Sequence, residues 1–296
     1  MAKGMIVKGI GGFYYVRTED GKIYETHAAG RFRKEGITPL VGDMVELTQS
    51  LDAISAISER KCAFVRPPVA NIDQMIVVLS TASPAVDLTM ADRFLFYIEK
   101  NGIDAVICIN KTDLDEKGEV EKVREIYEKA GYRVIVTSAV QKKGADELKA
   151  VLKDKISAFS GNSGVGKSSL LNLIDSDFAL STGEVSKKIM RGKHTTRHVE
   201  LMELSSGGFV LDTPGFGKID LPKMPAEDVQ LYFREFGKYI PLCRHRGCLH
   251  TKGTAGCAVI NAVQSGEIAQ SRYESYLAFC GELKDYKEWK NQKGLI

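Results

Sequence analysis

The feature that most constrains the fold is a phosphate-binding motif in the middle of the chain. Residues 161–168 read Gly-Asn-Ser-Gly-Val-Gly-Lys-Ser and match the pattern G-x-x-x-x-G-K-[ST]. The apolar run 156–159 predicts a strand before the motif, and residues 168–171 predict a helix after it. The motif needs this context because its glycines turn backbone N–H groups toward phosphates at the positive end of a helix. The sequence therefore predicts a nucleotide-binding α/β domain.

Side chains of the same motif suit a nucleotide with its magnesium ion. Lys167 can reach the β- and γ-phosphates, and the Ser168 hydroxyl can bind Mg²⁺. A glycine-rich turn that binds nothing is the alternative interpretation, and the Lys-Ser ending argues against it. The candidate phosphate-binding residues are Gly161, Asn162, Ser163, Gly164, Val165, Gly166, Lys167, Ser168 and Ser169.

Strands and helices alternate from residue 67 to the phosphate motif, which is typical of a doubly wound α/β domain. The run Arg66-Pro67-Pro68 precedes this region and predicts a linker. We expect strands at 74–79, 105–109 and 133–137, and helices at 87–101, 116–130 and 145–152.

A guanine-reading motif, Asn-Lys-Thr-Asp at 110–113, follows the second of these strands and matches N-K-x-D. The Asp113 carboxylate can accept hydrogen bonds from guanine N1–H and N2–H₂ together, a donor pair that adenine lacks. After the third strand, Thr137-Ser138-Ala139 resembles the companion loop, whose last N–H reaches guanine O6. The tetrapeptide alone occurs by chance, but its place at a strand end favours the functional interpretation. The candidate guanine-binding residues are Asn110, Lys111, Thr112, Asp113, Ser138 and Ala139.

The order of the motifs is unusual, because the guanine motifs precede the phosphate motif by about 50 and 25 residues. In ordinary GTPases the phosphate loop comes first. Two explanations are open: two unrelated sites, or one domain whose termini have moved. A sheet tolerates a cut in any loop, provided that its strands keep their neighbours and the new ends lie at the surface. We therefore favour a circularly permuted GTPase domain at residues 67–222.

The segment after the phosphate motif predicts the groups that bind the γ-phosphate. Residues 181–199 are polar, with five Lys or Arg residues and two His, and predict a switch loop. Thr196, favoured over Thr195, is the candidate ligand for Mg²⁺ and the γ-phosphate. A hairpin expected at 199–204 and 209–211 leads into Asp212-Thr213-Pro214-Gly215, which matches D-x-x-G. Asp212 would hold Mg²⁺ through water, and the Gly215 N–H would contact the γ-phosphate.

Phe216 stands where many GTPases carry the glutamine that orients the attacking water. A phenyl ring cannot hold this water, so we expect slow hydrolysis by the chain alone. His194 is the candidate substitute, since imidazole can hold water as donor or acceptor. A role of His194 in RNA contact or in the loop's own structure is the alternative. The candidate catalytic residues are Lys167, Thr196 and His194.

Residues 1–66 predict a small all-β domain. Alternating runs at 5–10, 13–18, 22–26, 44–48 and 53–58 suit a five-stranded oligonucleotide-binding (OB) barrel. The segment Arg31-Phe32-Arg33-Lys34 combines cations with an aromatic ring, a composition suited to phosphate contact and base stacking. A solvated loop on a barrel that only packs on its neighbour is the alternative. The candidate RNA-binding residues are Arg31, Arg33 and Lys34.

Residues 223–296 follow a second linker, at 221–225, and predict a mainly helical module with a metal site. Helix is expected at 226–238 and from 258 to 293. Soft ligands within fifteen positions suit a structural Zn²⁺ site of the Cys₃His type. His245 is the rival imidazole, but its place inside the first Cys-to-Cys loop makes tetrahedral closure harder. The candidate ligands are Cys243, Cys248, His250 and Cys257.

The composition fits a soluble globular protein, with 44% hydrophobic and 27% charged residues. The net charge is only +3, so a nucleic-acid role must depend on local patches. The amino terminus lacks a signal-like apolar core and the longest apolar runs are too short to cross a bilayer, so we expect a cytoplasmic protein without a membrane partner. Six cysteines in that compartment indicate metal binding or burial rather than disulfides.

The combination of barrel, permuted GTPase and zinc module resembles the ribosome small-subunit-dependent GTPase A family (RsgA, also called YjeQ or YloQ). The resemblance covers essentially the whole chain and includes residues 38–43, 66–68, 192–201 and 243–257. It implies a bacterial cytosolic GTPase that binds the nearly mature small ribosomal subunit and its rRNA, is stimulated by it and leaves on GTP hydrolysis. It also implies the four zinc ligands named above. Thr254-Ala255 departs from the Glu-Pro pair that is usual before the last cysteine.

Two other functions are open from the sequence. One is a GTPase that acts on another RNA or RNA–protein target, since a barrel and a zinc module would serve any such partner. The other is an RNA-binding switch with negligible turnover. Intact Lys167, Ser168 and Asp212 favour turnover, and a kinase would leave Asn110 and Asp113 unexplained. We expect a monomer that binds GTP and GDP, with one structural Zn²⁺ and with Mg²⁺ accompanying GTP.

Overall fold

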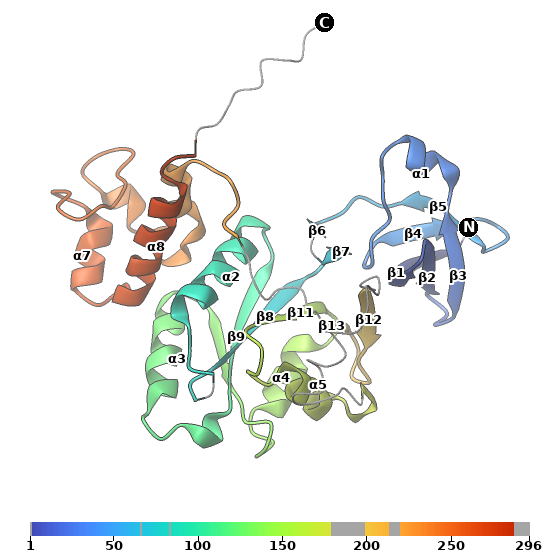
Figure 1. Cartoon of the computed structure of the whole chain (residues 1–296), viewed down its shortest axis with the longest axis horizontal. Helices are drawn as coiled ribbons and strands as arrows, with labels where there is room; N and C mark the ends of the chain where they lie inside the picture. Colours follow the sequence, from blue (N-terminus) through green and yellow to red (C-terminus); the bar gives the residue numbers. More distant parts are fainter. Residues whose placement is uncertain (1, 66, 83, 179–198, 213–219, 287–296) are drawn as a thin grey trace, which may run out of the picture.

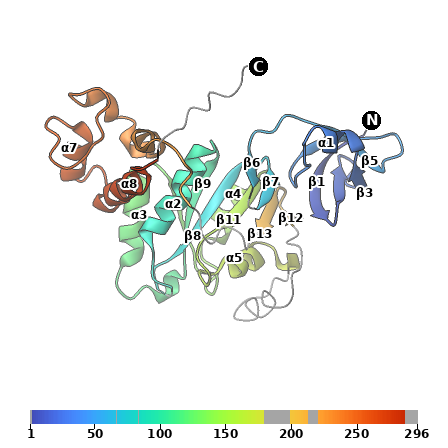
Figure 2. The ribbon, with the colours of Figure 1, turned by 45° about the horizontal axis from the view of Figure 1, so that its top comes forward.

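The computed structural model of the chain describes residues 2–65, 67–82, 84–178, 199–212 and 220–286. It consists of a β-barrel, a central α/β domain and a mainly helical C-terminal module. The two flanking modules lie at opposite ends of the central domain (Figure 1 and Figure 2). This architecture confirms the multidomain fold expected from the sequence. None of the helices in these ranges is long and apolar enough to cross a membrane.

Five strands of the N-terminal module close into a barrel in the order β1-β2-β3-β5-β4, because β4 also pairs with β1. Only the pairing of β3 with β5 is parallel. Inward-facing side chains such as Ile6, Val16 and Leu47 are buried and form the barrel core. The expected five-stranded OB-type barrel is confirmed. Its strands are β1 (Lys3–Ile10), β2 (Phe13–Thr18), β3 (Ile23–Ala28), β4 (Met44–Leu47) and β5 (Ala53–Ile57).

The basic segment after β3 forms the short helix α1 (Gly30–Lys34), and its aromatic ring faces inward. Phe32 is only 4% exposed, so the expectation that this ring stacks on a base is wrong. One side of this short helix faces the barrel core, and Phe32, its apolar residue, lies on that side. The three cations are exposed, and Arg31 donates to the backbone oxygen of Ser55.

The segment predicted as a linker around Pro67-Pro68 belongs instead to a β-hairpin. Strands β6 (Ala63–Val65) and β7 (Pro68–Ala70) pair antiparallel. Phe64 and Val69 are buried in one apolar cluster that also contains core residues of the barrel and of the central sheet. The connection is folded because its apolar side chains pack against both neighbours. Arg66 lies outside the described residues.

The strands of the central domain lie in the order β10-β9-β8-β11-β13-β12, and all neighbours are parallel except β12 and β13. All seven residues of β8 are buried, as expected for a parallel strand with helices on both faces. Helices α2 and α3 cover the face that carries Met75 and Val77, and α4 and α5 cover the face that carries Ile76 and Val78. The predicted alternation of strands and helices is confirmed.

The elements of this domain are the strands β8 (Gln74–Ser80), β9 (Asp104–Asn110), β10 (Arg133–Val136), β11 (Ile156–Ser160), β12 (Val199–Glu203) and β13 (Phe209–Asp212), the helices α2 (Leu88–Lys100), α3 (Glu119–Lys129), α4 (Ala145–Leu152) and α5 (Lys167–Ile174), and the 3₁₀ turns η1 (Thr112–Leu114) and η2 (Ser176–Phe178). Where the sequence predicted a helix or strand in this domain, the observed element lies within a few residues of the predicted range.

The C-terminal module begins with two short 3₁₀ helices, so the continuous helix predicted for 226–238 is wrong. They are η3 (Ala226–Tyr232) and η4 (Arg234–Phe236), and Phe233 between them has an extended backbone. The break buries Phe233 and Phe236 and directs Glu235 toward Arg272. Tertiary packing here overrides helix propensity.

The rest of the module contains η5 (Ile240–Leu242), α7 (Ala258–Gln264) and α8 (Gln270–Leu283). The predicted tail helix is therefore divided, and Gly266 with a φ of 77° lies in the break. Leu221 and Met224 of the predicted second linker are buried in the apolar core of this module, so that segment is not a free connection.

Arg272 of α8 joins the C-terminal module to the central domain through a buried ion network. Its guanidinium donates to Asp92 Oδ1 at 2.7 Å and to the two oxygens of Glu235 at 2.7 and 3.1 Å. Asp92 lies on α2 and also accepts from the Tyr127 hydroxyl of α3 at 3.1 Å. Phe96 of α2 packs in the core of the C-terminal module. Helix α2 is therefore shared by the two parts.

Candidate functional site

The predicted nucleotide-binding motifs converge at one edge of the central sheet. The parallel strands β9, β10, β11 and β13 all end at this edge, so the segments that follow them lie close together. Residues 110–113 begin at the end of β9, 138–139 follow β10, 161–168 follow β11, and Asp212 ends β13. The permuted chain therefore brings together motifs that are far apart in its sequence.

Asn110 links the guanine motif directly to the phosphate motif. Its Nδ2 donates to the Val165 backbone oxygen at 2.9 Å. Its Oδ1 accepts from the Ala139 N–H at 3.3 Å and from the Thr137 hydroxyl at 3.2 Å. The amide is buried, where an unpaired polar group would cost about 1–3 kcal/mol. One side chain thus holds three loops together, which excludes the interpretation as two unrelated sites.

Asp113, which is predicted to bind guanine, is held by the companion loop at residues 137–139. The Ser138 hydroxyl donates to Asp113 Oδ1 at 2.5 Å. The N–H and the hydroxyl of Thr112 donate to the Thr137 backbone oxygen at 3.3 and 3.1 Å. Lys111 has a left-handed backbone with a φ of 63°, which turns the chain sharply between β9 and η1. These contacts position all the predicted guanine-binding residues on two adjoining loops.

The phosphate motif forms a tight loop between β11 and α5. Gly161 and Gly166 have φ angles of 135° and 97°. A Cβ at Gly161 would lie 2.3 Å from a carbonyl oxygen of β8, and one at Gly166 would lie 2.4 Å from Asn110 Nδ2, so neither position accepts a side chain. Lys167 Nζ donates to the backbone oxygens of Gly161 and Asn162 at 2.8 and 3.1 Å. The ammonium is therefore held against the loop in which phosphates are expected.

Part of the predicted γ-phosphate machinery lies outside the described residues, and its assignment stays a prediction. Asp212 is the last residue of β13, and its backbone is in register with Phe159 of β11, just before the phosphate motif. The D-x-x-G motif thus begins at the expected edge of the sheet. The residues outside the described ranges are His194, Thr195, Thr196, Gly215 and Phe216.

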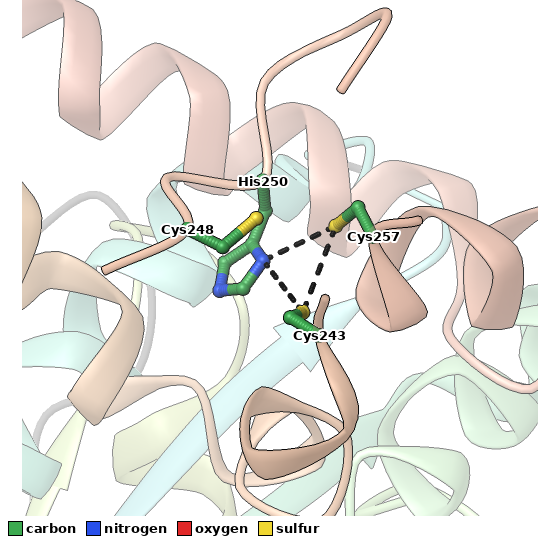
Figure 3. Close-up of side chains that lie close together, drawn as sticks. All are labelled: Cys243, Cys248, His250 and Cys257. Atoms are coloured by element: carbon green, nitrogen blue, oxygen red, sulfur yellow. Dashed lines mark hydrogen bonds between the residues drawn. The ribbon is translucent and has the colours of Figure 1, made fainter. Parts of the chain in front are cut away.

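The C-terminal module brings three thiols and one imidazole together, as Figure 3 shows. His250 Nδ1 lies 3.3 Å from Cys257 Sγ and 3.7 Å from Cys243 Sγ. His245, the rival imidazole, is exposed and does not belong to the group. The four ligand atoms lie within 4.8 Å of one another, a size and a donor set that suit a four-coordinate metal ion. They come from Cys243, Cys248, His250 and Cys257.

Gln230 orients the histidine of this cluster. His250 Nε2 lies 2.8 Å from Gln230 Oε1, so the Nε2 proton is donated there and Nδ1 faces the thiols. Burial lowers the pKa of His250, which favours the neutral form that binds metals. The Tyr273 hydroxyl donates to the His250 backbone oxygen at 2.6 Å and fixes the loop. Sequence reasoning missed Gln230 because it lies 20 positions from its partner, in a segment with no ligand pattern.

Two family models match the chain. The one described as RsgA N-terminal domain matches residues 3–57, and the one described as RsgA GTPase matches residues 57–222, which is more than half of the chain. The chain belongs to the RsgA GTPase family. As a member of this family it is a GTP-hydrolysing enzyme.

Relatives of the RsgA family extend this assignment over nearly the full length. The small ribosomal subunit biogenesis GTPase RsgA of Caldanaerobacter subterraneus subsp. tengcongensis is 48% identical over 294 residues, which cover 98% of each chain. The protein of the same name from Alkaliphilus metalliredigens is 45% identical and covers 98% of this chain and 100% of its own.

Two solved structures of this family have the same fold. YjeQ from Thermotoga maritima has a TM-score of 0.84 at 36% identity, covering 97% of this chain and 99% of its own. YloQ, described as a circularly permuted GTPase, has a TM-score of 0.80 at 37% identity, covering 97% of this chain and 96% of its own. The permuted arrangement expected from the order of the motifs is confirmed.

The loop that departs from the RsgA family pattern closes by a local turn. The N–H and the hydroxyl of Thr254 donate to the Thr251 backbone oxygen at 3.2 and 2.8 Å. This turn replaces the Glu-Pro pair usual in the family and still brings Cys257 to the cluster. The ligand geometry therefore does not depend on that pair.

Proposed function

We propose that this RsgA-family GTPase binds the nearly mature small ribosomal subunit in the cytoplasm, as a monomer, and leaves it when GTP is hydrolysed. The observation that carries the proposal is the bond from Asn110 of the guanine motif to Val165 of the phosphate motif. It occurs in a chain that is 48% identical to a protein named for small-subunit biogenesis. A joined site supports a guanine-nucleotide cycle rather than a passive RNA-binding fold.

The chemistry that we assign to the site follows from the groups that its loops position. Asp113 accepts from guanine N1–H and N2–H₂, and the Ala139 N–H donates to guanine O6. When GTP binds, the Lys167 ammonium donates to oxygens of the β- and γ-phosphates instead of to the two loop carbonyls. His194 holds the attacking water in place of the glutamine that Phe216 replaces. The contacts with Mg²⁺ and the γ-phosphate are assigned to Ser168, Thr196, Asp212 and Gly215.

We assign Zn²⁺ to the Cys₃His cluster, because three thiolates and an imidazole favour this ion over hard cations. Four protein ligands leave no open position, so the role of the ion is structural. On the barrel, the exposed cations Arg31, Arg33 and Lys34 of α1 are assigned to phosphate contacts with rRNA.

GTP turnover with and without purified small subunits tests the proposed function. We expect slow turnover by the chain alone and a rise of orders of magnitude with subunits. His194→Ala should lose the stimulated rate and retain GTP affinity and co-sedimentation with subunits, because the imidazole acts on water and not on the phosphates. Turnover that subunits do not change would favour another RNA target. GTP binding without measurable turnover would favour an RNA-binding switch.

A further inference from the structure

The barrel continues the central sheet through strand β12. β1 pairs with β4 along Lys3–Met5 and with β12 at Lys8 and Gly9, so β12 takes the part of the β1 edge that β4 leaves uncovered. A bulge between Ile6 and Lys8 separates the two pairings. Because a bulge bends and twists its strand, the two halves of β1 can serve two different partners. The barrel and the nucleotide domain thereby share one hydrogen-bonded sheet.

Two partly exposed ion pairs bridge this junction. Lys8 Nζ lies 3.0 Å from a carboxylate oxygen of Glu200, and the Arg17 guanidinium donates to both oxygens of Glu203 at 2.6 and 2.9 Å. The Arg17 guanidinium also lies 5.8 Å from the ring centroid of Phe209 on β13. Water reaches all four charged side chains, so these pairs form and break at little cost. The junction suits a contact that can shift.

Strand β12 lies between the two segments that are assigned to the γ-phosphate. It begins at Val199, where the predicted switch loop ends, and it pairs with β13, whose last residue is Asp212. β13 in turn pairs with β11, which leads into the phosphate motif. A displacement at Asp212 when GDP replaces GTP would therefore pass through the β12–β13 hairpin to β1.

We propose that the β1–β12 junction couples the bound nucleotide to the barrel, so that GTP and GDP give the barrel different affinities for ribosomal RNA. The inference rests on the proposed function, because it takes the barrel as an RNA-binding module and Asp212 as a Mg²⁺ contact. Coupling of this kind is reciprocal. If RNA and one of the two nucleotides favour the same position of β12, each raises the affinity of the chain for the other by the same factor. The small subunit thus acts on the nucleotide site through the barrel.

Charge reversal at the partly exposed Lys8–Glu200 pair tests the coupling, because neither side chain belongs to the apolar core. Lys8→Glu, Glu200→Lys and the double swap are compared by co-sedimentation of the full chain with small subunits, in GDP and in a non-hydrolysable GTP analogue. We expect the wild-type chain to bind more tightly with the analogue, each single reversal to reduce this ratio several-fold, and the swap to restore it. Lys3→Glu is the matched control, because it breaks only the Lys3–Glu46 pair within the barrel.

Hydrogen exchange without subunits gives a second measurement. We expect the amides of residues 8–9 and 199–200 to exchange several-fold differently in the two nucleotide states, and those of residues 3–5 to be unchanged. Two results together would overturn the inference. The first is equal exchange of these amides in both nucleotide states. The second is either single reversals that leave the wild-type affinity ratio unchanged or a wild-type chain that binds subunits equally well with GDP and with the analogue. A chain that shows the nucleotide-dependent exchange but does not bind small subunits would overturn the proposed function instead.

Discussion

The two modules that flank the nucleotide domain are attached by opposite kinds of chemistry. The barrel is joined by strand pairing and by ion pairs that water reaches, whereas the C-terminal module packs on α2 around charges that water does not reach. Arg272 and Asp92 are each 1% exposed, compared with 30% and 50% for Arg17 and Glu203. Both interfaces use an arginine and a carboxylate, so the difference between them is burial.

Burial decides what such a pair does for the protein. A buried charge must keep its partner, because an uncompensated charge in the interior costs several kcal/mol. The Arg272 network therefore fixes one orientation of the C-terminal module on α2 and α3. An exposed pair contributes about 0.2–1 kcal/mol and tolerates displacement. The C-terminal module is thus a fixed extension of the nucleotide domain, and the barrel is attached through a junction that can adjust.

The largest effect is expected on removal of the Zn²⁺ that we assign to the Cys₃His cluster. Chelation, or the variant Cys257→Ala, removes binding free energy on the order of 10 kcal/mol. The module after residue 222 should unfold, and GDP binding should persist because the nucleotide loops are held by their own contacts. Elemental analysis should find roughly one Zn²⁺ per chain, and limited proteolysis reports the unfolding. Cys280→Ala, at a cysteine outside the cluster, should retain both metal and fold. A metal-free chain with a fully protected C-terminal module would contradict the structural role.

Arg272→Met should have the next largest effect, a loss of about 3–5 kcal/mol in the free energy of unfolding. The variant keeps a long side chain but leaves the Asp92 and Glu235 carboxyls buried without their cation. Urea unfolding measures the loss. Arg93→Met is the matched control, since it removes the partly exposed pair with Glu282 on the same interface and should cost at most about 1 kcal/mol. Equal losses in the two variants would show that burial does not distinguish these pairs.

The pH dependence of Arg272→Met should reveal the buried Asp92 carboxyl. Burial raises the pKa of Asp92, and the Arg272 charge opposes this rise until the substitution removes it. A carboxyl with a raised pKa keeps its proton in the folded state, whereas the unfolded chain releases it above about pH 4. The stability of the variant should therefore fall as pH rises from that value through the folded-state pKa. Urea unfolding at about pH 5 and pH 7 should show the smaller loss of stability relative to the wild type at the lower pH. A loss that does not depend on pH would count against a buried, protonated Asp92.

The smallest effect is expected at the barrel junction. Arg17→Met should cost about 0.2–1 kcal/mol, because water and salt already screen the pair with Glu203. Raising the salt concentration should reduce the difference between this variant and the wild type in urea unfolding. A loss as large as that of Arg272→Met would remove the contrast between the two interfaces.

The sequence by itself predicted the candidate nucleotide and metal sites, because their chemistry needs particular residue types within a few positions. Residues 161–168 contain nearly all that a phosphate loop requires, and residues 110–113 and 243–257 do the same for guanine and for a metal. Apolar periodicity likewise predicted the barrel strands and the alternating strands and helices of the central domain. Local patterns of this kind can be read without knowing the fold.

Only the tertiary structure decided which rings and charges are buried. Phe32 lies among cations in the sequence but packs in the barrel, and Phe233 interrupts a segment with good helical periodicity. Arg272 pairs with Asp92, which is 180 positions away in the sequence. Lys8 pairs with Glu200, which is 192 positions away. The chain has 41 basic and 38 acidic side chains, and nothing local separates the few that pair inside from the many at the surface. Burial arises when distant elements pack together, so it follows from the assembled fold and from no single stretch of the chain.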